Sequence, residues 1–169
     1  PQLAPLYQQA LAYRDNFGGE VIFADRSMQM LLNTRAEFGA VLPKISQQAG
    51  YAAAPQALAD GKPVVGDKRQ GHIVNGSLVT IAVPVMREGV TRYLLLNVIE
   101  TRILQQRLDG LILPPAWVLT LFDGSGEVLA RHGPTPLHAD EHRDMQERIV
   151  IKSAVSRWSA VLEIPRAAY

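Results

Sequence analysis

The feature that most constrains the fold is a pair of nearly continuous apolar runs joined by a short loop. Residues 78–86 read Leu-Val-Thr-Ile-Ala-Val-Pro-Val-Met, residues 91–99 contain Leu94-Leu95-Leu96, and residues 87–90 between them contain Gly89. A short loop with glycine near its end predicts a β-hairpin. Strands without polar alternation are typical of a sheet that is covered on both faces. We therefore expect a central antiparallel sheet with a helix in front and a helix behind.

Two helical segments are available as covers. Residues 2–14 place one apolar stripe at helical spacing and end before Gly18-Gly19. Residues 43–59 are rich in alanine and glutamine and are interrupted by Gly50 and Pro55, which predicts two short helices. We expect both segments to pack on the hairpin.

The remaining segments predict further hairpins and a second module. The expected elements in chain order are a hairpin over 20–25 and 28–34, a short strand at 64–65, a loop over 66–77, a helix over 100–108, and hairpins over 117–131 and 149–164. Pro114-Pro115 marks a boundary between modules. The predicted fold class is α+β.

Composition and charge exclude several classes of protein. The chain has 169 residues, a formal net charge of +1 and no cysteine. These values exclude disulfide scaffolds, zinc knuckles and thiol enzymes, and they indicate no nucleic-acid partner. The longest apolar stretch, residues 111–122, contains two prolines and is too short to span a bilayer of about 30 Å. Because the chain begins at Pro1 and runs straight into a helical pattern, we expect a piece of a longer protein whose membrane anchors lie outside it.

Several short sequence segments resemble those of Cache-type sensor modules. The segments that carry the resemblance are Val21–Arg26 leading to Leu32-Asn33-Thr34, Val79–Val85 followed by Tyr93–Leu96, Leu113–Trp117, Leu121-Phe122-Asp123, Gly126–Ala130 and Trp158–Pro165. The resemblance covers roughly residues 1–166. It implies an N-terminal helix (1–16), a membrane-distal PAS-like module (17–110) and a reduced membrane-proximal PAS-like module (111–169).

The resemblance also implies a function. It indicates the periplasmic ligand-sensing region of an inner-membrane signalling protein, a two-component sensor histidine kinase, that binds a small, anionic molecule. No catalytic residue, metal or cofactor is expected in this region. A homodimer through the N-terminal helix and flanking transmembrane helices are the implied partners. The alternatives are a sensor of a diguanylate cyclase or chemoreceptor, or an interaction and dimerisation module with a vestigial pocket.

Two departures from the family pattern limit these expectations. Only residues 133–147 separate the two hairpins of the second module, so we expect a packing module without its own pocket. The Tyr-Arg-Trp-Tyr constellation of amino-acid-binding members is absent, because residues 44–62 contain Tyr51 but no arginine or tryptophan. An amino-acid ligand is therefore not supported by the sequence.

Five residues are candidates for ligand binding. Arg69 and His72 precede the central hairpin, where a guanidinium could clamp a carboxylate and an imidazole could donate a hydrogen bond. Tyr93 and Asn97 share one face of a strand by its period of two, and a buried Asn97 needs a polar partner, from a ligand or from the backbone. Arg35 faces either the pocket or solvent. For Arg69 and His72, an ordinary polar loop is an equally good interpretation.

A third class, a zinc hydrolase, rests on one short motif. Residues 138–142 fit H-x-x-E-H, which on a helix would place His138 and His142 one turn apart. Short motifs of this kind are weakly specific, and the flanking residues lack an apolar face that would hold a helix. We interpret this segment as a solvated polar stretch, and residues 123–127 as a hairpin turn.

Overall fold

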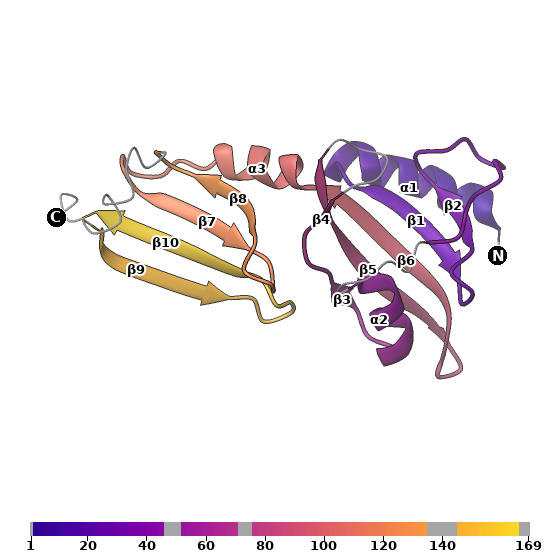
Figure 1. Cartoon of the computed structure of the whole chain (residues 1–169). Coiled ribbons are helices and arrows are strands. Elements are labelled where there is room, and N and C mark those ends of the chain that lie inside the picture. Colours follow the sequence, from indigo (N-terminus) through magenta and orange to yellow (C-terminus); the bar gives the residue numbers. More distant parts are fainter. Residues whose placement is uncertain (1, 46–51, 71–75, 135–144, 166–169) are drawn as a thin grey trace. The chain divides into compact units, whose positions relative to one another are not determined.

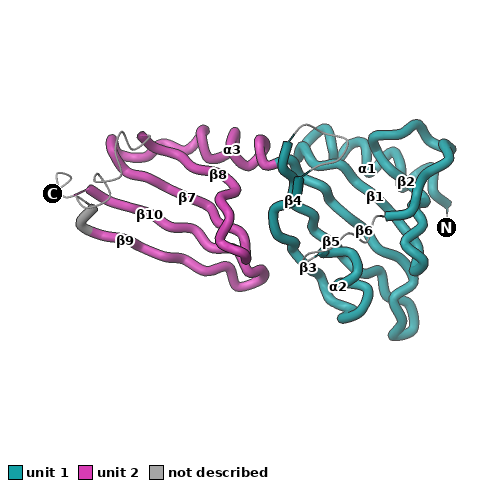
Figure 2. Tube along the Cα trace, in the orientation of Figure 1, with its two compact units in different colours: residues 1–100 teal, residues 101–169 magenta. Residues whose placement is uncertain are grey.

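The computed structural model describes residues 2–45, 52–70, 76–134 and 145–165, which form two compact units, residues 1–100 and 101–169 (Figures 1 and 2). The first unit contains α1 (Leu3–Phe17), β1 (Glu20–Asp25), β2 (Met30–Asn33), α2 (Ala53–Asp60), β3 (Val64–Val65), β4 (Arg69–Gln70), β5 (Ser77–Arg87) and β6 (Val90–Glu100). The second contains α3 (Thr101–Asp109), β7 (Val118–Phe122), β8 (Val128–His132), β9 (Met145–Lys152) and β10 (Ser159–Pro165). The α+β class and the PAS-like sheets that the sequence predicts are confirmed.

The sheet of the first unit is antiparallel, with the strand order β2-β1-β6-β5-β3 and β4 paired to β5. The long hairpin β5–β6 lies at its centre, and Val79, Leu94 and Leu96 are 0–2% exposed. One face packs against α2, through a core that includes Ala57, Leu94 and Leu96. The other face packs against α1, through a core that includes Ala10, Val21 and Phe23. The predicted sheet with helices on both faces is therefore confirmed, and Figure 1 shows α1 and α2 on its two sides.

Two local expectations were wrong. Residues 43–45 are extended rather than helical, because the backbone of Pro43 and Ile45 bonds to Met30 and Met28. Residues 69–70 are not loop but the short strand β4, held by pairing of Arg69 with Leu78. In both places a neighbouring strand supplies backbone partners that no local pattern reveals.

The second unit is a four-stranded antiparallel sheet with the order β8-β7-β10-β9. Helix α3 lies along β8, where the Gln105 side chain accepts a hydrogen bond from the Arg131 N–H (2.9 Å) and donates one to the Arg131 carbonyl (2.7 Å). These bonds place α3 with the second unit, so the division between units falls at residue 100, whereas the sequence interpretation ends the first module at residue 110.

Candidate functional site

A cavity of about 90 Å³ lies between α2 and the sheet of the first unit; we name it the α2-face pocket. Its floor is formed by alternate residues of β1 and β6, namely Ile22, Leu96 and Val98, because side chains two apart on a strand share a face. Residues 52–55, at the beginning of α2, form the opposite wall. The pocket is therefore a small apolar space between a helix and a sheet.

Polar groups enter the α2-face pocket from β4 and its neighbours. Arg69, Asp67 and Thr80 are among the residues that line it. Arg69 lies opposite Leu78 on β5, which lies opposite Glu100 on β6, so the guanidinium comes from the sheet edge on the α2 side. The sequence predicts Arg69 as a ligand-binding residue, and the structure places it at the rim of a pocket. The sequence does not identify Asp67 or Thr80 as pocket residues, because their positions depend on the pairing of β3 and β4 with β5.

Arg35 lies in an ion-pair cluster with two carboxylates. Its Nε is 3.7 Å from an oxygen of Glu20, and its Nη2 is 3.5 Å from an oxygen of Glu100. By strand alternation, Glu20 shares the face of Ile22 and Glu100 shares the face of Val98, so the cluster lies on the α2 side of the sheet. Arg35 is about one-quarter exposed and its charge is balanced by these two neighbours.

Tyr93 and Asn97 lie on the opposite face of the same sheet. Tyr93 stacks on Phe23 with ring centroids 4.9 Å apart, in the core beneath α1. Asn97 Nδ2 bonds to the hydroxyl of Tyr13 on α1 at 2.9 Å, which supplies the polar partner that the sequence requires. The shared face of Tyr93 and Asn97 is as predicted, but the sheet separates both residues from Arg69. The predicted residues are thus not brought into one site, and their roles in ligand binding remain predictions.

The Asn97 side chain lies very close to Gly19, just after the end of α1. A Cβ placed on Gly19 would collide with the Asn97 side chain, and Asn97 Oδ1 is buried without a hydrogen-bond partner among the described residues. A cavity of about 370 Å³ beside α1 is lined by Tyr13, Asn97 and mostly apolar side chains. The hydrogen bond between Asn97 and Tyr13 therefore links β6 to α1.

Several sequence candidates cannot be placed. His72, Tyr51, His138 and His142 lie outside the described residues. Among the residues that are described, no group of three or more metal-ligating side chains gathers. None of the described helices is both long and apolar enough to cross a membrane.

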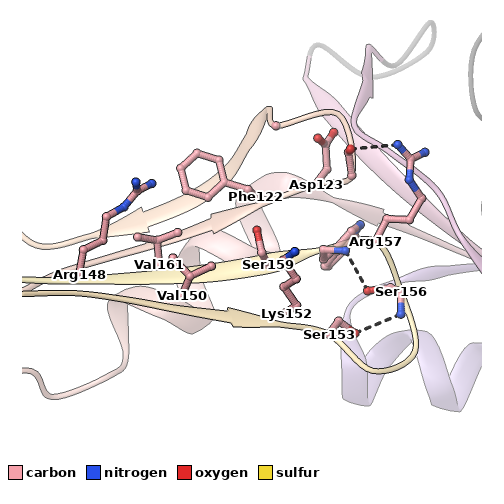
Figure 3. Close-up of a pocket in the computed structure, with 13 residues that line it drawn as sticks. Phe122, Asp123, Arg148, Val150, Lys152, Ser153, Ser156, Arg157, Ser159 and Val161 are labelled. Atoms are coloured by element: carbon pink, nitrogen blue, oxygen red, sulfur yellow. Dashed lines mark hydrogen bonds between the residues drawn. The ribbon is translucent and has the colours of Figure 1, made fainter.

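The second unit also has a hollow, on one face of its sheet beside the β7–β8 turn, with a volume of about 610 Å³ (Figure 3). This hollow is an open depression on the sheet surface rather than an enclosed cavity, so the expectation that this module lacks a pocket of its own stays a prediction. The hollow arises because residues 153–158, which connect β9 to β10, and the turn at 123–127 both border the same end of the sheet.

No protein-family model and no curated protein matches this sequence. Solved structures resemble it closely in fold. The extracellular domain of a candidate histidine kinase (rpHK1S-Z16) has a TM-score of 0.63 at 10% identity, over 96% of this chain and 78% of that chain. The sensory domain of the Campylobacter jejuni chemoreceptor Tlp3 has a TM-score of 0.62 at 14% identity, over 96% of this chain and 73% of that chain.

Two further comparisons extend this set. Methyl-accepting chemotaxis protein X has a TM-score of 0.63 at 17% identity, over 98% of this chain and 82% of that chain. The Tlp3 ligand-binding domain in complex with L-valine has a TM-score of 0.59 at 13% identity, over 96% of this chain and 73% of that chain. Sensor domains of two classes of signalling protein thus share the helix, sheet and second sheet described above. The chain shares the fold of these extracellular sensory domains.

Proposed function

We propose that this chain is the extracytoplasmic ligand-sensing domain of a membrane-bound two-component sensor histidine kinase, and that its α2-face pocket binds a short carboxylate. The observation that carries this proposal is the position of Arg69 at the rim of a small, otherwise mostly apolar space between α2 and the sheet. The similarity in fold to extracellular sensory domains supports the sensing role. The proposal assigns no catalytic step to this domain.

The chemistry of the pocket favours a short aliphatic acid. A guanidinium binds a carboxylate through two parallel hydrogen bonds, and this geometry fixes the orientation of the ligand. The side chains of Ile22, Leu96 and Val98 then contact the apolar part of the molecule. The volume of about 90 Å³ is below the roughly 300–1,000 Å³ that drug-sized ligands occupy, so the site favours a ligand with only a few heavy atoms.

A bound carboxylate would contact two elements, α2 and β6, at once. It would contact residues 52–55 of the α2 side and Leu96 and Val98 of β6. Strand β6 ends at Glu100 and α3 begins at Thr101, so the strand that lines the pocket continues directly into the second unit. Ligand binding shifts an equilibrium between two arrangements only when one arrangement binds the ligand more tightly. We infer that the arrangement with α2 held against β6 is the tighter one.

A thermal-shift panel tests this proposal. The panel contains acetate, propionate, lactate, pyruvate and succinate, with L-valine and L-isoleucine as the amino-acid arm. A ligand at a hundredfold excess over its Kd stabilises the folded state by about 2.7 kcal/mol, which raises Tm by several degrees. We expect at least one short carboxylate to do so in the wild-type chain.

Variants locate the response. Arg69→Ala is expected to weaken binding about tenfold or more, and Arg69→Lys to restore only part of it, because lysine lacks the planar fork. Arg92→Ala is the matched control, since Arg92 is an exposed arginine on β6 that does not line the pocket. A panel without any stabilising carboxylate, or a response that Arg69→Ala leaves unchanged, would contradict the proposal. A response to L-valine alone would move the ligand class to amino acids.

We further propose that the domain forms a homodimer through α1. The tilted rings of Tyr13 and Phe17 contact each other with centroids 4.9 Å apart and are 40% and 56% exposed, which is unusual for two adjacent aromatic side chains on one helix. Light scattering coupled to size-exclusion chromatography tests the proposal. We expect a concentration-dependent dimer that Phe17→Ser weakens, whereas a monomer at every concentration would contradict it.

A further inference from the structure

We propose that the hollow of the second unit is a second ligand site, for an aromatic molecule that carries two anionic groups. This site is independent of the α2-face pocket and does not rest on the function proposed above. Its volume of about 610 Å³ lies within the roughly 300–1,000 Å³ that is usual for small-molecule sites.

The strand register determines which side chains face the hollow. Phe122 on β7 lies opposite Ser159 on β10, and Ser159 lies opposite Lys152 on β9. In the next row Val161 lies opposite Val150. Figure 3 shows these side chains on one side of the sheet, with Arg148 farther along β9 and Arg157 reaching toward the β7–β8 turn.

The side chains that line the hollow carry a net positive charge. Arg148, Lys152 and Arg157 line it, and Asp123 is the only carboxylate among the described residues that line it. Asp123 is 3% exposed, and its Oδ1 accepts hydrogen bonds from the N–H and hydroxyl of Ser125 and from the N–H of Glu127. Among the described residues, the side chains of Arg148 and Lys152 have no hydrogen-bond or ion-pair partner. A ligand with negative charge would supply one.

Hydrogen-bond donors also converge on this region. Ser153 Oγ accepts the N–H groups of Val155 (3.2 Å) and Ser156 (3.1 Å), so its own O–H remains to be donated. Ser156 Oγ accepts the N–H of Trp158 (3.2 Å) in the same way. Arg157 Nη2 donates to the carbonyl of Gly124 (2.9 Å), which holds its guanidinium beside the turn. The O–H groups of Ser153 and Ser156 and the cationic side chains are therefore hydrogen-bond donors, and they favour a ligand that carries hydrogen-bond acceptors.

The apolar part of the hollow selects an organic ligand over an inorganic ion. The rings of Phe122 and Trp158 and the side chains of Val150 and Val161 line it, and Val150 is 50% exposed. A flat hydrocarbon body would remove this surface from water. Arg148 and Lys152 are separated by four residues of one strand, about 13 Å between Cα atoms, which favours two anionic groups on one ligand.

Terephthalate, a benzene ring with two carboxylates, is a suitable probe. The chain contains two tryptophans, and only Trp158 lines the hollow, so Trp117→Phe leaves Trp158 as the single tryptophan reporter. We expect terephthalate to change the Trp158 fluorescence of the 169-residue chain saturably, with an affinity that falls as salt is added. Succinate, which lacks the ring, and benzamide, which lacks the charge, are expected to bind about tenfold more weakly.

Variants that remove the positive charges test whether Arg148 and Lys152 bind terephthalate. Arg148→Gln and Lys152→Gln are each expected to raise the Kd for terephthalate about fivefold, and the double variant more than tenfold, because exposed ion pairs contribute at most about 1 kcal/mol each. Arg92→Gln is the matched control in the first unit and is expected to leave the Kd unchanged. Arg69→Ala is also expected to leave it unchanged, which separates this site from the α2-face pocket.

If Trp117→Phe lowers Tm, isothermal titration calorimetry measures the Kd for terephthalate in chains that keep Trp117, with and without the charge-removing substitutions. The absence of both heat and fluorescence change would overturn the proposal. Equal affinity in the wild-type chain and in the Arg148→Gln/Lys152→Gln double variant would also overturn it, and so would loss of terephthalate binding in Arg69→Ala.

Discussion

The two units build the first corner of their sheets from the same hydrogen bonds. In each corner, an aspartate Oδ1 accepts three hydrogen bonds, from the N–H and hydroxyl of a serine two residues later and from the N–H of the residue four positions later. These residues are Asp25, Ser27 and Gln29 in the first unit, and Asp123, Ser125 and Glu127 in the second. The aspartate carboxylate accepts hydrogen bonds from backbone N–H groups of the turn that would otherwise have no acceptor within the protein. Local chemistry alone is thus sufficient to set the corner.

The fourth residue of the corner distinguishes the two units. Both positions are left-handed, with φ of +66° at Met28 and +87° at Gly126. A Cβ on Gly126 would meet nothing within 4 Å, whereas Met28 is 3% exposed and belongs to the core beneath α2. The left-handed conformation costs a side chain about 1–2 kcal/mol. Burial of a methionine more than offsets that cost in the first unit, and glycine avoids it in the second.

The largest expected effect comes from removing the buried methionine. Met28→Ala keeps the strained backbone and leaves a cavity in the core, so we expect a loss of about 2–5 kcal/mol in the free energy of unfolding. Gly126→Ala introduces only the backbone strain and is expected to cost about 1 kcal/mol. Urea denaturation of both variants measures the difference.

A third variant separates strain from burial. Met28→Gly relieves the left-handed strain that Met28→Ala retains, although a more flexible unfolded chain offsets part of that gain. We expect Met28→Gly to be more stable than Met28→Ala by about 0.5 kcal/mol. Equal losses for Met28→Ala and Gly126→Ala would show that burial does not distinguish the two corners.

The next effect concerns the aspartates themselves. Asp123 is 3% exposed, whereas Asp25 is only half-buried, although both accept the same three hydrogen bonds. Removing the acceptor leaves donors unsatisfied, which costs more where water cannot reach them. We expect Asp123→Ala to cost about 3 kcal/mol and Asp25→Ala about 1 kcal/mol, measured by urea denaturation. Ser125→Ala and Ser27→Ala serve as milder controls, and an order reversed between the two units would contradict the role of burial.

The sequence predicts these corners well because their chemistry is local. Asp25 and Asp123 each stand between two apolar runs, and that pattern is enough to place both hairpins. The burial of β6 is also predictable, since Leu94-Leu95-Leu96 leaves no polar face.

The candidate sites are less predictable because they depend on pairings between distant residues. A period of two places Tyr93 and Asn97 on one face, but only the packing of α1 determines which face that is. Arg69 reaches the α2-face pocket because β4 pairs with β5, a two-residue contact that has no pattern of its own. The hollow of the second unit likewise depends on Lys152 lying opposite Ser159.

The smallest effect is a dependence on pH at the more accessible corner. The hydrogen bond from the Ser27 hydroxyl, with those from the Gln29 and Ser27 N–H groups and the charge of Lys44, holds the pKa of Asp25 below its ordinary value of 3.8, against a weaker effect of burial. Because the folded pKa lies below the unfolded one, the ionised carboxylate stabilises the fold above about pH 4, and this contribution is lost as the pH falls through the folded pKa. Asp25→Asn keeps the acceptor oxygen but removes the charge. We therefore expect the wild-type chain to exceed Asp25→Asn in stability at neutral pH by an amount that stays constant down to about pH 5 and shrinks below about pH 4.

Urea denaturation at several pH values measures this gap, and Ser27→Ala, which removes the largest cause of the lowered pKa, should reduce it. Parallel stability curves for the wild-type chain and Asp25→Asn across the acid range would mean that charge has no role in this corner and that geometry alone holds it.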